Sequence, residues 1–373
     1  MCSEAELEIM KIIRNISDLK LDNTIVTLGK FDGSHIGHRL LFDTAIAIKN
    51  GDLQLTAGSD DDISKTKKEN DDIITKMQAV DAPGSVGANK DNAGSADNIS
   101  IEYKTVIFTF DIHPGQVIKD DGSRTIQTHD EREVYSYPDG IDYFIEFPFN
   151  KTTMNMEPED FVKDILVDKL GVKVIVVGKD FHFGRNRSGS VETLVELGRR
   201  YGFIVRAMDK VMYRPSDRDE EVEVSSTVIK EEIILGHMED VTNMLGKPYS
   251  VCEKVLHGKH LGSTIGIPTI NQIVPHDKIL PRDGVYATRT LIDGRAYISI
   301  TNVGCRPTFD DGEFRSVETF ILDYDGDLYG RTIEVLFYKF IRSEKKFAGI
   351  DELKAEISRN VIEAQEFFSR LEN

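Results

Sequence analysis

The sequence predicts an α/β + β protein, in which a Rossmann-like, doubly wound α/β domain precedes a small antiparallel β-barrel with a C-terminal helix. Its 373 residues are long for one domain and favour two. Strand-like and helix-like segments alternate from residue 24 to about 208, which is typical of a parallel sheet covered on both faces. From Val222 onward, strands of alternating polarity are divided by turns such as Asp293-Gly294, which is typical of an antiparallel domain.

The first domain is expected to contain five short apolar strands with helices between them. The run Val174–Val177 is continuously apolar, as suits a strand that is buried on both faces. The predicted strands are Thr24–Leu28, Thr105–Phe110, Tyr143–Phe147, Val172–Val177 and Phe203–Ala207. The predicted helices are His38–Lys49, Asp130–Ser136, Pro158–Leu170 and Val191–Tyr201.

The second domain is expected to begin after two short helices, Ser226–Leu235 and Met238–Leu245, at the breaker sequence Gly246-Lys247-Pro248. We therefore predict domains of residues 1–245 and 246–373. The predicted strands of the second domain are Gly284–Ile292, Ala296–Val303, Ser316–Leu322 and Thr332–Phe340. So small an antiparallel sheet needs to close into a barrel, and the amphipathic helix Ile350–Leu371 is expected to pack on it.

Residues 51 to about 103 break this pattern, because they are poor in aromatic residues and rich in Gly, Ser, Asp and Asn. A segment of this composition buries too little apolar surface to offset the conformational entropy that it would lose on folding. We predict a disordered insertion or a long surface loop, within which a short helix near Ile73–Val80 is the one candidate element. A docking segment for a partner is the functional alternative.

Composition also limits the functional classes. A net charge of −18 argues against a nucleic-acid backbone as partner, although a nucleotide needs only a local pocket. The sequence has no apolar run long enough to cross a bilayer and no signal-peptide pattern, so a membrane is not expected as a partner. Three cysteines, Cys2, Cys252 and Cys305, form no disulfide framework. A cytoplasmic protein is the simplest expectation, and protein partners stay open.

The most informative stretch is Gly29–His38, Gly-Lys-Phe-Asp-Gly-Ser-His-Ile-Gly-His, which lies between a predicted strand and a predicted helix. A glycine-containing turn at such a place lets backbone N–H groups and the helix N-terminus face an anion. His35 and His38 are three residues apart and can reach the same phosphate. A histidine can also share a proton near neutral pH. The stretch predicts a nucleotide site, and the alternative is an ordinary turn with two surface histidines.

Further polar segments lie where ligands bind in such sheets. Asp111–Pro114 follows the strand that ends at Phe110, and Gly178–Gly184 follows the strand that ends at Val177. Ser225-Ser226-Thr227 begins a helix, where hydroxyl groups are ordinary caps but also suit a second anion site.

These segments belong to an ordered set of motifs that runs through both halves of the chain. In the first half they are Gly29-x-Phe31-Asp32-Gly33-x-His35-x-Gly37-His38, Phe108-Thr109-Phe110-Asp111-x-His113-Pro114, Gly178-x-Asp180-Phe181-x-Phe183-Gly184 and Val224-Ser225-Ser226-Thr227-x-Ile229. In the second half they include His257-Gly258-x-x-x-Gly262-x-x-x-Gly266-x-Pro268-Thr269-x-Asn271, Asn302-x-Gly304-x-x-Pro307-Thr308, Ser316-Val317-Glu318-Thr319 and Asp327-Leu328-Tyr329-Gly330. The set closely resembles the bacterial bifunctional riboflavin kinase/FAD synthetases, over the whole chain except residues 51–103.

For the first domain the resemblance implies a nucleotidylyl transferase that joins AMP from ATP to FMN. His35 and His38 match the His-x-Gly-His pair that steadies the phosphates. The implied ATP-binding residues are Gly29, Phe31, Asp32, Gly33, Gly37, Ser225, Ser226, Thr227 and Lys230. Lys230 stands where the family usually has Arg, so the charge is kept and the bidentate fork is lost. The implied flavin-binding residues are Asp111, His113, Asp180 and Phe181.

For the second domain the resemblance implies a riboflavin kinase barrel. Thr269 and Asn271 match the motif that holds Mg²⁺ beside the phosphates, and oxygen ligands are those that Mg²⁺ prefers. Glu318 matches the base for the riboflavin 5′-hydroxyl, a task that suits a carboxylate within hydrogen-bond reach. The implied ATP-binding residues of this domain are Gly258, Gly262, Thr264 and Gly266. Without the resemblance, Glu318 reads as a solvated strand residue and 258–271 as a loop.

The expected function is therefore phosphorylation of riboflavin to FMN, followed by adenylylation of FMN to FAD and pyrophosphate. ATP, riboflavin and FMN are the expected substrates, with Mg²⁺ as cofactor. One alternative is a riboflavin kinase whose first domain is degenerate, because of Lys230. A second is a non-catalytic flavin-binding protein, and a more distant one is a transferase for another nucleotide alcohol or phosphate.

Overall fold

The computed structural model describes residues 10–53, 102–112, 124–134, 137–257, 266–307 and 313–372. Most of the predicted insertion, residues 54–101, lies outside this part of the chain, and so does the possible helix at Ile73–Val80. The chain divides into two compact units. The first comprises residues 1–121 and 136–211, and the second comprises residues 122–135 and 212–373.

The first unit is built on a six-stranded parallel sheet in the order β1-β4-β3-β2-β5-β6. Its strands are β1 (Lys11–Ile13), β2 (Thr24–Leu28), β3 (Lys104–Phe110), β4 (Tyr143–Phe147), β5 (Val172–Gly178) and β6 (Ile204–Met208). The central strand β2 pairs with β3 on one side and β5 on the other, with Val26 opposite Val106 and Ile175. Five strands were predicted with ends within one residue, whereas β1 was not.

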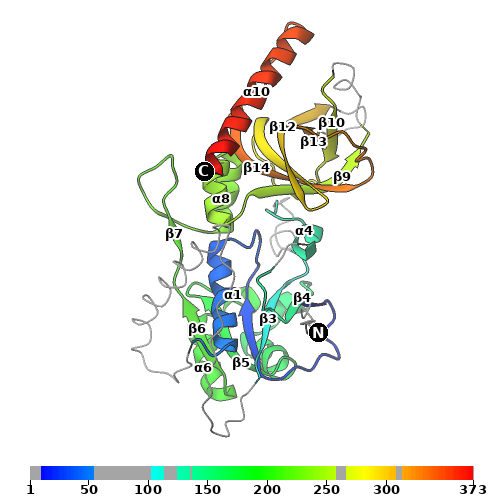
Figure 1. Ribbon diagram of the computed structural model, residues 1–373. Helices are drawn as coiled ribbons and strands as arrows, with labels where there is room; N and C mark the ends of the chain where they lie inside the picture. Colours follow the sequence, from blue (N-terminus) through cyan, green and yellow to red (C-terminus); the bar gives the residue numbers. More distant parts are fainter. Residues whose placement is uncertain are drawn as a thin grey trace, which may run out of the picture. The chain divides into compact units, whose positions relative to one another are not determined.

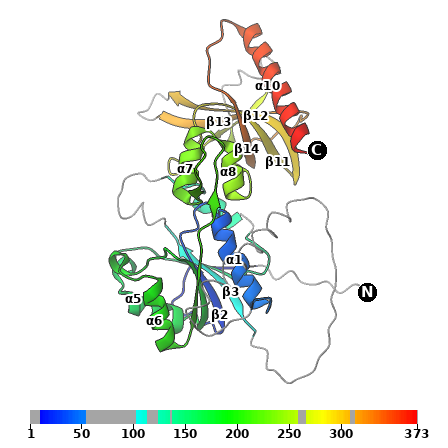
Figure 2. The same cartoon turned by 90° about the vertical axis from the view of Figure 1, so that its left-hand side faces the viewer.

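Helices cover both faces of this sheet, as the sequence predicts (Figure 2). The helical elements are α1 (Ile36–Lys49), α5 (Pro158–Asp160), α6 (Val191–Tyr201), the 3₁₀ turns η1 (Thr153–Asn155) and η3 (Arg185–Arg187), and the π-helix η2 (Phe161–Val167). Val26 and Leu28 pack with η2 and α6, and α1 lies on the opposite face. The predicted helix Pro158–Leu170 is only one α-turn followed by η2, because Asp168 N–H bonds the carbonyl oxygen of Lys163, five residues back, at 2.9 Å.

The second unit contains a closed six-stranded antiparallel barrel in the order β10-β13-β12-β11-β14-β9 (Figure 1). Its strands are β9 (Tyr249–Leu256), β10 (Thr269–Ile273), β11 (Gly284–Ile292), β12 (Arg295–Pro307), β13 (Glu313–Ile321) and β14 (Thr332–Arg342). A small ribbon of β7 (Met212–Tyr213) and β8 (Val222–Glu223) precedes the helices α7 (Ser226–Leu235) and α8 (Met238–Leu245). The predicted barrel is confirmed, with β9 and β10 in addition.

The C-terminal helix α10 (Ile350–Leu371) packs on the barrel, as predicted. Ala364 and Phe368 are fully buried against Val285, Ala287 and Ile300. These helix residues are four apart, so they lie on one stripe that faces the sheet.

The barrel interior is partly polar, and its buried hydroxyl residues show which strand positions face inward. Thr288, Ser299, Thr301 and Thr319 are completely buried and linked by hydroxyl hydrogen bonds of 2.8–2.9 Å. Since successive strand residues alternate between faces, the neighbours of these residues, Glu318 among them, lie on the outer face.

A segment from the first half of the sequence belongs to the second unit. Residues 124–134, which we call the crossing segment, include α4 (His129–Val134) and follow β3 in the chain. Thr125 N–H bonds the carbonyl oxygen of Asp277 at 2.6 Å, and Ile279 N–H bonds the carbonyl oxygen of Thr125 at 2.9 Å. The crossing segment is thereby tied to the chain between β10 and β11.

A buried ion pair adds to this attachment. Lys278 Nζ contacts Glu131 Oε2, with side-chain exposures of 1% and 2%. Glu131 also accepts hydrogen bonds from the N–H groups of Cys252 in β9, at 3.1 Å, and of Thr128, at 2.9 Å. Removing one partner from such a pair costs about 3–5 kcal/mol, because the other charge stays buried. The crossing segment is therefore an integral part of the second unit.

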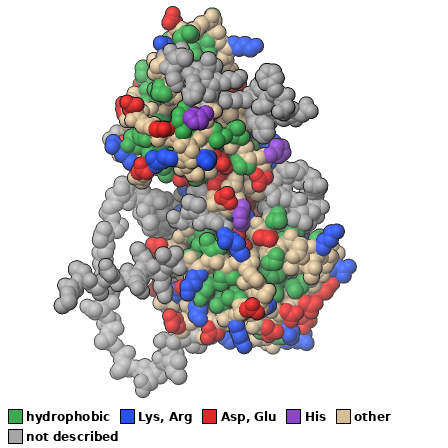
Figure 3. Space-filling model, turned by 90° about the vertical axis from the view of Figure 1, so that its right-hand side faces the viewer, with side chains coloured by type: hydrophobic (Ala, Val, Ile, Leu, Met, Phe, Trp, Pro, Cys, Tyr) green, Lys and Arg blue, Asp and Glu red, His purple; other side chains and the backbone are tan. Residues whose placement is uncertain are grey.

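Helices α7 and α8 also group with the barrel rather than with the parallel sheet. The domain boundary at residues 245/246 stays a prediction. Of the helices in the described part of the chain, none has both the length and the apolar character that crossing a bilayer requires. On the face shown in Figure 3, Lys and Arg side chains lie among Asp and Glu side chains over both units.

Candidate active sites

The stretch Gly29–His38 forms a tight turn between β2 and α1. Phe31, Gly33 and Ser34 have positive φ values of 47°, 89° and 45°, a region that residues other than glycine enter at a cost. Phe31 is fully buried, and the edge of its ring packs against His38, with centroids 5.1 Å apart. This buried phenylalanine anchors the turn in its strained conformation.

The two histidines lie side by side at the start of α1. His35 is the N-cap residue, and its ring stacks on that of His38, with centroids 3.6 Å apart and planes inclined by 21°. In the described part of the chain, neither Nδ1 atom has a hydrogen-bond partner, although both are buried. Unpaired buried nitrogens of this kind are costly and suit a ligand that supplies oxygen atoms.

Both rings are neutral at pH 7 in the ligand-free protein. Burial lowers the pKa of His35 to about 4, and the nearby Asp32 carboxylate opposes that shift. Burial, together with His35, holds the pKa of His38 well below its ordinary value. A neutral imidazole still has one N–H to donate, so the pair can donate to phosphate oxygens, whose negative charge would raise both pKa values.

The lowered pKa of His35 makes the stability of the protein depend on pH. Below about 6.5 the unfolded chain takes up a proton at this position that the folded chain refuses until about pH 4, so acidification favours unfolding. Between pH 7 and pH 5 we expect a loss of about 2 kcal/mol from this residue alone. The variant His35→Gln should therefore lose less stability over that interval, measured by thermal unfolding at both pH values. Equal losses in both proteins would contradict this prediction.

The parallel sheet places this turn at its topological switch point. After β2 the chain moves to β3 on one side, and after β5 it moves to β6 on the other side. In sheets of this kind, ligands bind in a crevice at the point where the direction changes, which here lies beyond the ends of β2 and β5. Asp180 and Phe181 follow β5 directly, so the predicted flavin-binding pair and the histidine turn lie at the same edge. Phe181 stacks on Phe183 with centroids 5.8 Å apart, and Asp180 forms an ion pair with Lys210 at 3.4 Å.

Asp111 has a structural task at the end of β3. Its Oδ1 accepts hydrogen bonds from the N–H of Ile112 at 2.7 Å and from the N–H of Phe149 at 2.8 Å. It thereby joins the ends of β3 and β4. His113, its predicted partner at the flavin end, lies outside the described residues.

The second predicted phosphate segment begins α7, which belongs to the second unit. Ser225 is the N-cap of this helix, and its hydroxyl oxygen accepts from Val228 N–H at 3.4 Å. Ser226, Thr227 and Lys230 follow in the first turns. Ser225 therefore caps α7, which is the simpler of the two roles expected from the sequence.

On the barrel, three predicted residues lie together on the outer face. Asn271 in β10 and Glu318 in β13 are directly opposite each other, and Thr269 lies two residues before Asn271 on the same face. On the other side of Glu318, its direct partner is Asn302 in β12. The row Asn271–Glu318–Asn302 thus sets a half-buried carboxylate between two amides.

The glycine-rich run that precedes β10 is described only in part. Gly258, Gly262 and Thr264 lie outside the described residues, and Gly266 is exposed just before β10. At the start of this run, the rings of His257 and Tyr329 stack with centroids 3.9 Å apart.

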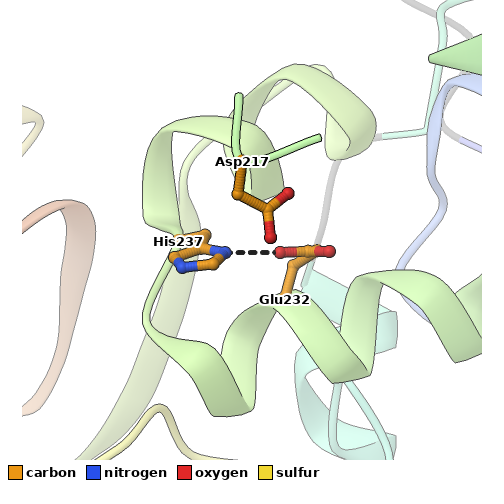
Figure 4. A group of neighbouring side chains, drawn as sticks. All are labelled: Asp217, Glu232 and His237. Carbon is orange, nitrogen blue, oxygen red and sulfur yellow. Dashed lines mark hydrogen bonds and ion pairs between the residues drawn. The ribbon is translucent and has the colours of Figure 1, made fainter. Parts of the chain in front are cut away.

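A third group of polar side chains was missed by the sequence analysis. Asp217, Glu232 and His237 converge beside α7 (Figure 4), with the His237 Nδ1 2.7 Å from a carboxylate oxygen of Glu232. Their spacing would suit a metal ion, but Arg218 contacts both carboxylates. The guanidinium already neutralises this cluster, and we interpret it as a salt-bridge network that secures the buried Glu232.

The fold and the two sites define a class of two-domain enzymes that act on nucleotide phosphates. A protein of Escherichia coli (strain K12), named bifunctional riboflavin kinase/FMN adenylyltransferase, is 30% identical over 365 residues, which are 96% of this chain and 98% of that protein. The chain belongs to the bifunctional riboflavin kinase/FMN adenylyltransferase family.

Other comparisons agree. The riboflavin kinase family model matches residues 245–368, and the FAD synthetase model matches residues 95–228, a range that includes Ser225–Thr227 but not His35 and His38. A relative of the same name from Buchnera aphidicola of Schizaphis graminum is 28% identical and covers 96% of this chain and 99% of its own. A Streptococcus pneumoniae crystal structure titled macrolide-efflux protein has a TM-score of 0.74 at 24% identity, covering 96% of this chain and 99% of its own. That likeness shows the fold alone.

Proposed function

We propose that this chain phosphorylates riboflavin to FMN at the barrel and adenylylates FMN to FAD at the parallel sheet. The observation that carries the proposal is that each unit holds its own array of polar groups suited to a transfer at phosphorus. The sheet has the stacked histidines at its switch point, and the barrel has the row Asn271–Glu318–Asn302. Both reactions are transfers at phosphorus, in which positioning and charge stabilisation supply the catalysis.

At the barrel, Glu318 acts as the general base. The riboflavin 5′-hydroxyl oxygen attacks the γ-phosphorus of ATP, the bond from that phosphorus to the bridging oxygen breaks, and ADP leaves. The hydroxyl proton passes to the Glu318 carboxylate. A base must lie within hydrogen-bond reach of the proton that it removes, and the outer face of β13, where Glu318 is half-buried, is the face on which we place the flavin hydroxyl.

The donor set beside Glu318 fits Mg²⁺. The Thr269 hydroxyl and the Asn271 amide supply oxygen atoms, which are the ligands that Mg²⁺ takes together with phosphates and water. Asn271 Nδ2 is engaged with the Thr269 carbonyl oxygen at 3.4 Å, so its amide oxygen would be the atom that holds the ion. When bound, the ion would neutralise negative charge on the ATP phosphates.

At the parallel sheet, His35 and His38 hold the phosphates while an FMN phosphate oxygen attacks the α-phosphorus of ATP. The bond from the α-phosphorus to the α–β bridging oxygen breaks, and pyrophosphate leaves. The N-terminus of α1 adds backbone N–H groups that have no partner within the helix. Asp180 and Phe181, after β5, line the flavin end of the same crevice.

The test is to incubate the purified protein with riboflavin, ATP and Mg²⁺ and to separate the flavins by chromatography. FMN followed by FAD is the expected result. FMN alone would favour a kinase with a degenerate first domain, the alternative that Lys230 in place of Arg suggests. If neither FMN nor FAD is formed, the alternative of a non-catalytic flavin-binding protein is favoured. We place both reactions in the cytoplasm.

A further inference from the structure

We propose that Asn302 and Glu344 form a positioning pair that aims the Glu318 carboxylate in the riboflavin kinase reaction. The inference rests on the proposed role of Glu318 as base. Nothing in the sequence motifs draws attention to Glu344, which follows β14 in a charged stretch. The register of the barrel and one side-chain hydrogen bond bring the pair to the site.

Asn302 is one of the two direct neighbours of Glu318 across the sheet. The two residues are direct partners in the β12–β13 ladder, and side chains at such positions on one face have Cβ atoms about 4.5–5.5 Å apart. The flanking residues Thr301 and Val303 are fully buried inside the barrel, so Asn302 points to the outer face with Glu318.

Glu344 holds the amide of Asn302 from the other side. Asn302 Nδ2 donates to Glu344 Oε1 at 3.2 Å. The carboxylate reaches this position over Gly304, where an added Cβ atom would lie 2.5 Å from Glu344 Oε1. A residue with a side chain at position 304 would therefore displace the Glu344 carboxylate.

This arrangement decides which end of the amide faces the base. A carboxylate only accepts hydrogen bonds, whereas the amide nitrogen has two N–H groups. With one N–H engaged by Glu344, the Asn302 amide keeps a second N–H, and the proposal is that this N–H donates to the neighbouring Glu318 carboxylate during the reaction. A glutamate has three side-chain torsions, so a fixed donor beside it narrows the positions that its carboxylate visits. A neutral amide between the two carboxylates also limits their repulsion.

The test uses full-length protein and steady-state kinetics of both reactions. Glu344→Ala, Asn302→Ala and Gly304→Ala each break the same contact, and each should lower kcat for FMN formation about 10- to 100-fold, as expected for a misplaced catalytic group. The KM for ATP should stay near the wild-type value, because none of these residues lies in the nucleotide loop. FAD formation from supplied FMN reports that each variant is folded.

Two features separate positioning from a general structural effect. Glu344→Gln keeps an acceptor oxygen for Asn302 and should restore most of kcat, and Glu344→Ala combined with Asn302→Ala should be no worse than either alone. Glu363→Ala removes a partly buried ion pair with Lys339 and serves as a matched control with unchanged kcat. Wild-type kcat in Glu344→Ala, a Glu344→Gln variant as slow as Glu344→Ala, or additive losses would each overturn the proposal. If Glu318→Gln itself retained kinase activity, the proposed role of the base would fail instead.

Discussion

Replacing Glu318 by Gln is expected to reduce FMN formation by about 10²–10⁴-fold, the contribution of a general base, while FAD formation from supplied FMN continues. The amide cannot take the hydroxyl proton, although it fills the same volume on the outer face of β13. Because the register sets Glu318 between Asn271 and Asn302, the substitution leaves the ladder and the barrel core unchanged. The measurement is the initial rate of each reaction, with riboflavin and with FMN as separate substrates.

A matched control is available on the same barrel. Glu334→Gln makes the same chemical change at a half-buried position of β14, and should leave both rates near wild type. Loss of both activities in Glu318→Gln would contradict the assignment of the two reactions to separate sites, and an unchanged kinase rate would exclude Glu318 as the base.

Replacing His38 by Ala is expected to have the opposite outcome, with FAD formation reduced about 10²–10³-fold, as for the loss of one oxyanion donor, and FMN formation retained. The substitution removes one of two stacked rings whose Nδ1 atoms lack hydrogen-bond partners in the described part of the chain. Initial rates of FAD formation at saturating FMN and ATP measure the effect.

The control for this variant is His276→Ala, at an exposed position between β10 and β11. It should alter neither rate. An unchanged rate of FAD formation in His38→Ala would remove this residue from the phosphate site. Kinase activity retained by the same protein shows that the chain has folded.

Local patterns predict those elements whose sequence contains its own start and stop signals. Helix α7 begins at the cap Ser225 and ends before Gly236, and it was predicted with the bounds observed, as were α6 and α8. Strands β9 and β10 were missed, because a strand beside a glycine-rich run has little periodicity of its own. Their pairing within the closed barrel creates them, and that is a long-range effect.

The sites were predictable in composition but not in geometry. Residue types at the ends of β2 and β5 indicate a ligand, because parallel strands end at one edge. The row of Asn271, Glu318 and Asn302 depends on register across three strands, which no local pattern specifies. Asp111 was expected to contact flavin, yet its described bonds are to backbone N–H groups of its own unit. That contact therefore stays a prediction.

The path of the chain through its two units determines whether either unit can be obtained separately by cleavage or truncation. The polypeptide passes from one unit to the other after residues 121, 135 and 211, so a single cleavage cannot release either unit as a self-contained product. A gene fragment that starts at residue 246 would encode Lys278 without Glu131, and would leave an ammonium group buried with no carboxylate beside it. A separately expressed kinase domain should therefore also include residues 122–135.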